Sequence, residues 1–448
     1  MSAQPLEGES LLAMQTDKTF RVRISQTRGT FSKLISAIAA TDVSFGNITT
    51  RHIGRKYVYR DITIEFRNEA EFVRTRQAIE AVPGVIIDLV VDEVMSRHEG
   101  GKMSYRGRVE PSTLAELREI YTPGVAKVCR AIQADPALAR RYTNAGNTVA
   151  VVSNGTRVLG LGDIGPQASL PVMESKALFY GQLVGLNAVA LVLGARGVDE
   201  FVETVVRIAP SFAGIHLEDI RSPDCVEIER RLIERLQIPV MHDDQHGTAV
   251  VALAAMQNML RRRNKVIGEM TIAQVGLGAA GLAIAVLAKV AGARSVIGVD
   301  PQAEVARLAE AQGIRVVSLA DALREADLIC LTTGKPGLLT PSMIRSGQFI
   351  LALTNPIPEI EADEALQAGA TMAADGRNVN NLLCYPGMFK GAIDAGARSI
   401  SQEMKLVAAK VIADAAQDGE LLPEVLDKSL HAAVAGAVAQ TAREVQGN

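Results

Sequence analysis

The chain has 448 residues, of which 48% are hydrophobic and 22% are charged, and its formal net charge is −3. This length exceeds that of a usual single domain, so we expect two or three domains. A near-neutral charge without a dominant Lys or Arg run argues against nucleic acid or an anionic membrane as the main partner. The four cysteines lie far apart without a Cys-x-x-Cys pair, which fits buried thiols in a reducing cytosol. The first 16 residues lack the pattern of a secretory signal, and no apolar run is long enough to span a bilayer.

The segment 19–95 alternates strands of period two with helices of period 3.6. Strands are expected at 20–25, 44–52, 57–66 and 85–94, and helices at 30–41 and 69–81. This β-α-β-β-α-β order predicts a small ferredoxin-like domain that follows an N-terminal tail at 1–18. A polar stretch at 96–104 is expected to link this domain to the rest of the chain.

This segment also resembles an ACT domain, a small regulatory module that often binds amino acids or other metabolites at a dimer interface. The resemblance rests on the glycine turn that opens the first helix, Arg28–Leu34, and on the start of the second strand, Val43–Ile48. It implies a small-molecule effector at this domain and a homodimer or higher homo-oligomer. A dimerisation module without a ligand is the alternative.

Two acidic clusters follow short apolar segments in the next block, residues 105–265. Glu218-Asp219 follows 212–217, and Asp243-Asp244 follows 236–241. If both segments are parallel strands, the clusters lie at the carboxyl ends, where open α/β sheets bind ligands. Carboxylates there suit Mg²⁺ or Mn²⁺, whereas helix caps and solvated turns are the ordinary alternative. His242 and His246 could form another site, with hydrogen bonding and packing as their alternative roles.

An Asn154-Gly155 pair lies between two apolar runs, 149–153 and 157–161. Because such a pair accepts the positive φ angles of a type I′ turn, the sequence predicts a β-hairpin. Arg157, just past the turn, is a candidate clamp for a substrate carboxylate, since its guanidinium can bind two oxygens at once. A surface strand arginine is the alternative.

The last block, 266–448, opens with a strand at 271–275 and a glycine-rich loop, which consists of Gly276, Leu277, Gly278, Ala279, Ala280 and Gly281. A helix follows, and a second strand ends at Asp300, nineteen residues after Gly281. These parts predict a Rossmann-type NAD-binding domain, in which the loop approaches the pyrophosphate and Asp300 holds the ribose hydroxyls. Asp300 favours NAD, but NADP stays open because Arg294 or Arg307 could reach a phosphate.

A series of ordered motifs resembles those of the malic enzyme family, in its bacterial type. The motifs are Tyr121–Ala126, Val158–Gly165, Pro171–Lys176, Leu217–Ile220, His242–Gly247, Asn355-Pro356 and Asn380–Gly387. The resemblance covers about residues 105–440. It extends the prediction from a fold to a reaction.

The resemblance implies a role for each matching residue. Lys176 is the base, Asp243 orients or tunes it, and Tyr121 is the acid. We expect a lowered pKa at Lys176, from a neighbouring cation, partial burial and hydrogen bonding. The implied metal ligands are Glu218, Asp219 and Asp244. The implied contacts to substrate and nicotinamide are Arg157, Asn355 and Asn381, with Asn380 the less favoured neighbour.

The expected protein is a cytoplasmic α/β enzyme with a ferredoxin-like (ACT-like) domain, an α/β malate- and metal-binding domain and a Rossmann-type NAD-binding domain. Its expected reaction is the oxidative decarboxylation of (S)-malate to pyruvate and CO₂, with reduction of NAD or NADP and a requirement for Mg²⁺ or Mn²⁺. Two alternatives are a malolactic-type enzyme that releases lactate and a metabolite sensor without turnover. A sensor would need neither the base Lys176 nor the acid Tyr121.

Overall fold

The computed structural model describes residues 16–158, 160–195 and 197–447. The chain divides at Lys102 into two compact units, which are described separately. The predicted tail at 1–18 and the expected lack of a secretory signal at 1–16 fall outside the described residues, except that residues 16–18 belong to the first strand. Among the described residues, no helix is long and apolar enough to cross a membrane.

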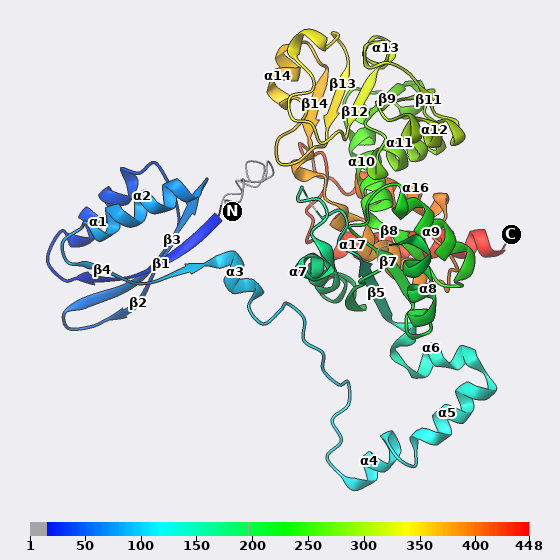
Figure 1. Ribbon diagram of the computed structural model, residues 1–448, viewed down its shortest axis with the longest axis horizontal. Coiled ribbons are helices and arrows are strands. Elements are labelled where there is room, and N and C mark those ends of the chain that lie inside the picture. Colours follow the sequence, from blue (N-terminus) through cyan, green and yellow to red (C-terminus); the bar gives the residue numbers. More distant parts are fainter. Residues whose placement is uncertain (1–15, 159, 196, 448) are drawn as a thin grey trace, which may run out of the picture. The chain divides into compact units, whose positions relative to one another are not determined.

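The first unit is a four-stranded antiparallel sheet with two long helices, in the predicted β-α-β-β-α-β order (Figure 1). The strand order is β2-β3-β1-β4. Alternate residues of β1 and β3, such as Phe20 and Ile62, pack with Leu34 and Ile79 of the helices in one core. A short helix follows β4, so the first residues of the predicted linker are helical. The elements are β1 (Thr16–Ser25), α1 (Thr30–Ala39), β2 (Ser44–Ile53), β3 (Tyr57–Phe66), α2 (Glu69–Glu80), β4 (Val85–Asp92) and α3 (Glu93–His98).

The second unit begins with short helices that bury none of their residues. Local capping stabilises the first of them: the Thr113 side chain accepts from the Glu116 backbone, and the Glu116 side chain accepts from the Thr113 backbone in return. The elements are α4 (Leu114–Ile120), α5 (Val125–Ala134), η1 (Pro136–Leu138), α6 (Ala139–Tyr142) and η2 (Asn144–Gly146).

A four-stranded parallel sheet follows, in the order β6-β5-β7-β8. Figure 1 labels β5, β7 and β8 of this sheet. Every residue of β5, β7 and β8 is buried, which explains their continuous apolar runs. Glu218 follows β7 and Asp243 follows β8, so the prediction that both acidic clusters lie at the carboxyl ends of parallel strands is confirmed. The strands are β5 (Thr148–Ser153), β6 (Asn187–Val192), β7 (Gly214–Leu217) and β8 (Val240–His242). The helices are α7 (Gly165–Phe179), η3 (Tyr180–Val184), α8 (Val198–Ile208), η4 (Ala209–Ser211), α9 (Asp224–Arg235) and α10 (Asp243–Arg261).

The predicted hairpin at Asn154-Gly155 is wrong. β5 pairs in parallel with β6 and β7, and the described residues after Gly155 form only an isolated bridge between Val158 and Gly162. Gly155 does have a positive φ of 68°, but a Cβ there would lie 2.1 Å from the Gly165 carbonyl oxygen. The turn therefore brings the chain against the start of α7 instead of back along β5.

The rest of the unit contains a six-stranded parallel sheet in the order β11-β10-β9-β12-β13-β14. This is the strand order of a doubly wound dinucleotide-binding fold, as predicted. Its elements are η5 (Ile267–Glu269), β9 (Thr271–Val275), α11 (Ala279–Val290), β10 (Ser295–Val299), α12 (Ala303–Ala311), β11 (Arg315–Val316), α13 (Leu319–Glu325), β12 (Leu328–Leu331), η6 (Pro341–Met343), β13 (Phe349–Ala352), α14 (Ala362–Gln367) and β14 (Met372–Asp375).

One large core joins the two parallel sheets. It contains residues from β5, α10, α11 and the C-terminal helices, and α10 packs against both α11 and α16. The C-terminal elements are η7 (Gly376–Asn378), η8 (Asn381–Leu383), α15 (Tyr385–Asp394), α16 (Gln402–Asp414) and α17 (Lys428–Gly447). Because the sheets share an interior, the loops at their carboxyl ends can form one site.

Candidate active site

A cavity of about 510 Å³ is lined by loops from both parallel sheets. The lining residues that the sequence had predicted as site residues are Arg157, Lys176, Glu218, Asp219, Asp244, Gly278, Ala279, Ala280, Gly281, Asn355 and Asn381. A larger cavity of about 570 Å³ near Arg398 and Gln446 contains none of them. The sequence-predicted residues thus gather at one place in the fold.

Lys176 is held by three acceptors at the wall of this cavity. Its Nζ donates to Asp243 Oδ2 at 2.6 Å and to Asn381 Oδ1 at 3.1 Å, and it lies 3.0 Å from Glu218 Oε1. The same ammonium lies 4.9 Å from the centre of the Tyr385 ring. These contacts come from α7, α10, the end of β7 and the C-terminal segment, so the position of Lys176 depends on long-range packing.

The pKa of Lys176 is raised and not lowered, so the prediction of a lowered value is wrong for the chain by itself. Burial acts to lower this pKa, but the facing charges of Asp243 and Glu218 outweigh burial and raise it well above its ordinary value. The prediction had assumed a cation next to Lys176. The charged side chains that contact its ammonium are instead the carboxylates of Asp243 and Glu218. Burial also raises the pKa of Glu218 to about 8 and that of Asp243 to about 6, although Lys176 opposes both shifts.

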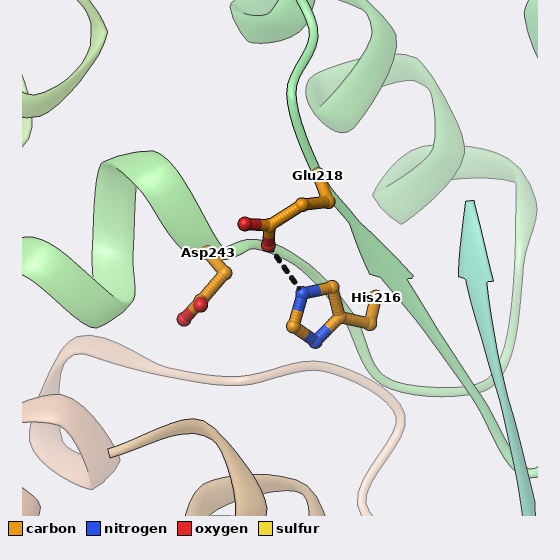
Figure 2. Close-up of side chains that lie close together, drawn as sticks. All are labelled: His216, Glu218 and Asp243. Carbon is orange, nitrogen blue, oxygen red and sulfur yellow. Dashed lines mark hydrogen bonds and ion pairs between the residues drawn. The ribbon is translucent and has the colours of Figure 1, made fainter. Parts of the chain in front are cut away.

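His216, Glu218 and Asp243 form a buried cluster (Figure 2). Lys176 contacts both of its carboxylates. The His216 ring bonds through Nε2 to Glu218 Oε2 at 2.7 Å and through Nδ1 to the Tyr180 hydroxyl at 2.8 Å. Burial lowers the pKa of His216 to about 4, so the ring is neutral near pH 7. Since the Lys176 ammonium contacts both carboxylates of this cluster, the cluster fits that ammonium better than a metal ion.

A second carboxylate cluster, Glu218, Asp219 and Asp244, has ligand oxygens within 4.8 Å of one another. Asp244 Oδ2 also accepts from the Asp219 backbone N–H at 2.8 Å, and Asp219 has a left-handed φ of 54°. Three converging carboxylates repel one another unless a cation neutralises them, and oxygen ligands suit Mg²⁺ or Mn²⁺. The residues therefore fit a hard divalent cation.

Asp243 and Asp244 are adjacent, as the first two residues of α10. They nevertheless diverge, because successive helical residues are rotated by about 100°. Asp243 contacts Lys176, while Asp244 contacts Asp219. Gly247 is required next to them, since a Cβ there would lie 1.9 Å from Asp243 Oδ1.

The glycine-rich loop closes the other side of the cavity. Gly276 has a φ of 86°, and a Cβ on Gly281 would lie 1.9 Å from the Gly276 carbonyl oxygen. These two glycines therefore fold the loop back on itself at the start of α11. Asp300 accepts backbone hydrogen bonds from Leu277 and Gln302, both at 2.9 Å, which links the loop to the end of β10.

Comparison with known proteins identifies the family. Residues 108–196 and 194–233 match the malic enzyme N-terminal domain, and residues 240–342 match the NAD-binding domain of D-isomer specific 2-hydroxyacid dehydrogenases. NAD-dependent malic enzyme 1 of Bacillus subtilis is 43% identical over 434 residues, which cover 96% of this chain and 99% of that protein. This chain belongs to the malic enzyme family.

Other members of the malic enzyme family match a smaller part of the chain. The bifunctional malic/malolactic enzyme of Bacillus subtilis is 39% identical and covers 77% of this chain and 90% of its own length. The crystal structure of malic enzyme from Pyrococcus horikoshii has a TM-score of 0.74 at 37% identity, covering 79% of this chain and 90% of that one. About a fifth of the present chain lies outside each of these matches.

Four of the predicted site residues do not line the cavity of this malic enzyme family member. Asp243 contacts the lining residue Lys176, and the Gly276 carbonyl oxygen accepts from the lining residue Thr332. Asp300 contacts Leu277, the neighbour of the lining residue Gly278. Tyr121 differs from them, because it directly follows α4 and is 66% exposed. The structure therefore does not bring Tyr121 to Lys176 within the described chain.

Several residues of the site were missed by sequence reasoning. His216 lies within an apolar segment of the sequence, and its bonds to Glu218 and to Tyr180 depend on the packing of α7 against the sheet. Tyr385 lies within a family motif, but its ring beside Lys176 could not be foreseen from spacing alone. Ser222, Thr248 and Thr332 complete the polar lining.

Proposed function

We propose that this malic enzyme family member converts malate to pyruvate and CO₂ with reduction of NAD, and that it requires a divalent cation. The observation that carries this proposal is a single cavity in which Lys176, a three-carboxylate cluster and a glycine-rich loop meet. A wall of ionisable side chains opposite a glycine-rich loop suits a small dicarboxylate and a dinucleotide. The 43% identity to an NAD-dependent malic enzyme supports the same reaction.

The first step is the oxidation of malate at C2. Lys176 would take the hydroxyl proton, and a bound NAD would accept the hydride that leaves C2, so that malate is oxidised and NAD is reduced. The three acceptors around Nζ favour the ammonium form of Lys176, which has no lone pair to accept a proton. Lys176 must therefore first release a proton, and Asp243 is its nearest acceptor at 2.6 Å. We propose Lys176 and Asp243 as a coupled base.

Glu218, Asp219 and Asp244 are proposed to hold Mg²⁺ or Mn²⁺. When bound, such a cation would act as a Lewis acid toward an oxygen of the substrate. Arg157 lines the same cavity and is placed by the bond from its backbone N–H to the Asp219 carbonyl oxygen at 3.1 Å. It is proposed to bind a substrate carboxylate. Asn381 accepts from Lys176 and Asn355 donates to the Gly376 carbonyl oxygen, and both asparagines line the cavity.

The second step breaks the bond between C3 and C4 of the keto acid. CO₂ leaves, the electron pair remains as an enolate, and a proton returns to C3. We propose Tyr121 as the source of that proton, on family resemblance, although its exposed position requires α4 to move or a second chain to supply it. The exposed apolar residues of α4, such as Leu114 and Ile120, favour a homo-oligomer that covers them.

The experiment combines turnover with metal dependence. NADH formation should require malate and Mn²⁺, and Asp244→Asn should raise the Mn²⁺ concentration for half-maximal activity by about tenfold or more, because a ligand charge is lost. Asp199→Asn, at a side chain that is 88% exposed, is the control and should behave as the parent chain. Failure of the parent chain to form NADH from malate would contradict the proposal.

A second candidate function is the malolactic reaction, in which NAD stays bound and lactate is released. The relative that favours it is the bifunctional malic/malolactic enzyme, at 39% identity. Assaying lactate and NADH together from malate distinguishes the two. Net NADH without lactate supports the decarboxylating dehydrogenase.

We also propose that the first unit is a ferredoxin-like, ACT-like domain that binds a small-molecule effector. Its element and strand order, and a left-handed Gly29 before α1, support this interpretation. A chain lacking residues 1–95 should keep its turnover and lose any response to amino acids or central-carbon metabolites. A response that survives the deletion would place the effector elsewhere.

A cytoplasmic location is part of the proposal. All four cysteines are free thiols, which fits a reducing compartment. Three of them are buried as expected, but Cys129 is exposed on α5.

A further inference from the structure

A buried polar network lies beneath the acidic side of the cavity and has no role in the reaction as described so far. Its centre is Glu229 of α9, which is 6% exposed. One carboxylate oxygen, Oε1, accepts from the backbone N–H of His242 at 2.7 Å. The other, Oε2, bonds to His246 Nε2 at 2.9 Å and accepts from Gln245 Nε2 at 3.4 Å. All of these partners lie at the start of α10.

The network extends to a third helix through His246. Lys405 of α16, also 6% exposed, donates from Nζ to His246 Nδ1 at 3.0 Å. The imidazole can accept from Lys405 and donate to Glu229 only as the neutral tautomer with its proton on Nε2. Consequently a buried cation and a buried anion are joined through one neutral ring, from α16 across α10 to α9.

This network acts on the turn that carries the acidic residues. α10 begins without a side-chain cap of its own, although its first turn contains the adjacent carboxylates Asp243 and Asp244. Glu229 supplies the missing acceptor from another helix. His246 is two residues after Asp244 and therefore about 200° away around the helix. It can thus bond to Glu229 and Lys405 on the face of α10 away from the cavity, while Asp244 lines the cavity.

We infer that Glu229, His246 and Lys405 are positioning residues that hold the first turn of α10 so that Asp244 can bind the divalent cation and Asp243 can contact Lys176. The inference rests on the proposed cation site. None of the three lines the cavity, so their effect must pass through α10. Outer residues that orient the ligands of a metal commonly change metal affinity or activity by about 10–100-fold when replaced.

The test uses the purified full chain and measures Mn²⁺ binding directly, by electron paramagnetic resonance of the free ion. Glu229→Gln leaves one acceptor oxygen for two donors, so an amide N–H must face the N–H of either His242 or His246, and the dissociation constant for Mn²⁺ should rise by about tenfold or more. In the metal-free chain, amide hydrogen exchange of the first turn of α10, including Asp243 and Asp244, should become faster. The dissociation constant for NAD should stay within about twofold, because the glycine-rich loop is not in the network.

Two further variants make the result specific. Glu234→Gln makes the same chemical change on the same helix but removes only an exposed ion pair with Arg230, and its Mn²⁺ binding should match that of the parent chain. Lys405→Met leaves the contacts of Glu229 intact and removes the donor to His246, so a smaller loss of Mn²⁺ affinity is expected. If Glu229→Gln does not fold, Lys405→Met decides the question alone.

Parent-like Mn²⁺ binding and exchange in a folded Glu229→Gln or Lys405→Met chain would overturn the inference. Equal losses of Mn²⁺ and NAD affinity would also overturn it, since they would indicate a general effect on folding. Neither outcome depends on malate turnover. An inactive parent chain that binds Mn²⁺ would contradict the proposed reaction while leaving the inference about Glu229 to be judged by binding.

Discussion

The two walls of the cavity are built by different means. The wall from the first parallel sheet carries ionisable side chains, namely Lys176 and the carboxylates after β7 and β8. The wall from the second sheet consists mainly of backbone and small residues, Gly278 to Gly281, with amides and hydroxyls nearby. Replacements in the first wall should change the chemistry, whereas replacements in the second should change which cofactor fits and how tightly.

The largest expected effect is at Lys176. Lys176→Ala removes the base from the acidic wall and should lower kcat on the order of 10²-fold or more, with the dissociation constant for NAD nearly unchanged. Lys410→Ala, which removes a lysine that is 68% exposed, is the control. A Lys176→Ala chain with the kcat of the parent would break the distinction between the walls.

A replacement in the glycine wall should show the opposite pattern. Gly281→Ala puts a Cβ 1.9 Å from the Gly276 carbonyl oxygen, so the loop must open. We expect the KM for NAD to rise on the order of tenfold while Mn²⁺ binding is kept. Gly436→Ala is the control, because a Cβ there meets nothing within 4 Å. Loss of Mn²⁺ affinity in Gly281→Ala would mean that the two walls are not independent.

Cofactor choice should change by a smaller factor at Asp300. Asp300→Ser removes the charge that would repel a 2′-phosphate, and the ratio of kcat/KM for NAD over NADP should fall several-fold. The change is limited because Asp300 also accepts from Leu277 and Gln302, and its loss loosens the loop for both cofactors. Comparing both cofactors in Asp300→Ser and in Glu304→Ser, a nearby exposed acid, measures the effect. An unchanged ratio would contradict a role for Asp300 in cofactor choice.

The smallest effect concerns the stability of the metal-free chain. The pKa of Glu218 is raised to about 8, chiefly by burial, so the folded state keeps a proton that the unfolded state has lost above pH 4.5. This contribution to the free energy of unfolding therefore falls as pH rises from 4.5 to about 8. As pH rises over this range, the melting temperature of the metal-free parent chain should therefore fall relative to that of Glu218→Gln. The same dependence of melting temperature on pH in both chains would contradict the raised pKa of Glu218.

The sequence predicted the arrangement of the site better than its electrostatics. The acidic clusters and the glycine-rich loop were placed correctly, because the carboxyl ends of parallel strands are recognisable from apolar runs followed by polar residues. The raised pKa of Lys176 was missed, because it depends on Asp243 and Glu218, which are distant in sequence. Local pattern alone does not reveal which charges will face one another in a buried place.

The hairpin at Asn154-Gly155 failed for a related reason. The pair has the turn residues that a hairpin needs, but the parallel neighbours of β5 already occupy both of its edges. The pairing of β5 with β6 and β7 therefore prevents the hairpin. Gly155 instead lets the chain pass close to Gly165. The network around Glu229 was also invisible in the sequence, because its members come from three helices.

Helix α10 has a consequence for how this chain tolerates insertions and deletions. The helix begins with Asp243 and Asp244 and packs along α11, the helix that starts in the glycine-rich loop. One residue inserted within α10 would shift the remainder of the helix by about 1.5 Å and rotate it by about 100°, so the acidic turn and the cofactor loop would lose their common register. Natural length variation should therefore be found in the exposed connections between elements and be excluded from α10.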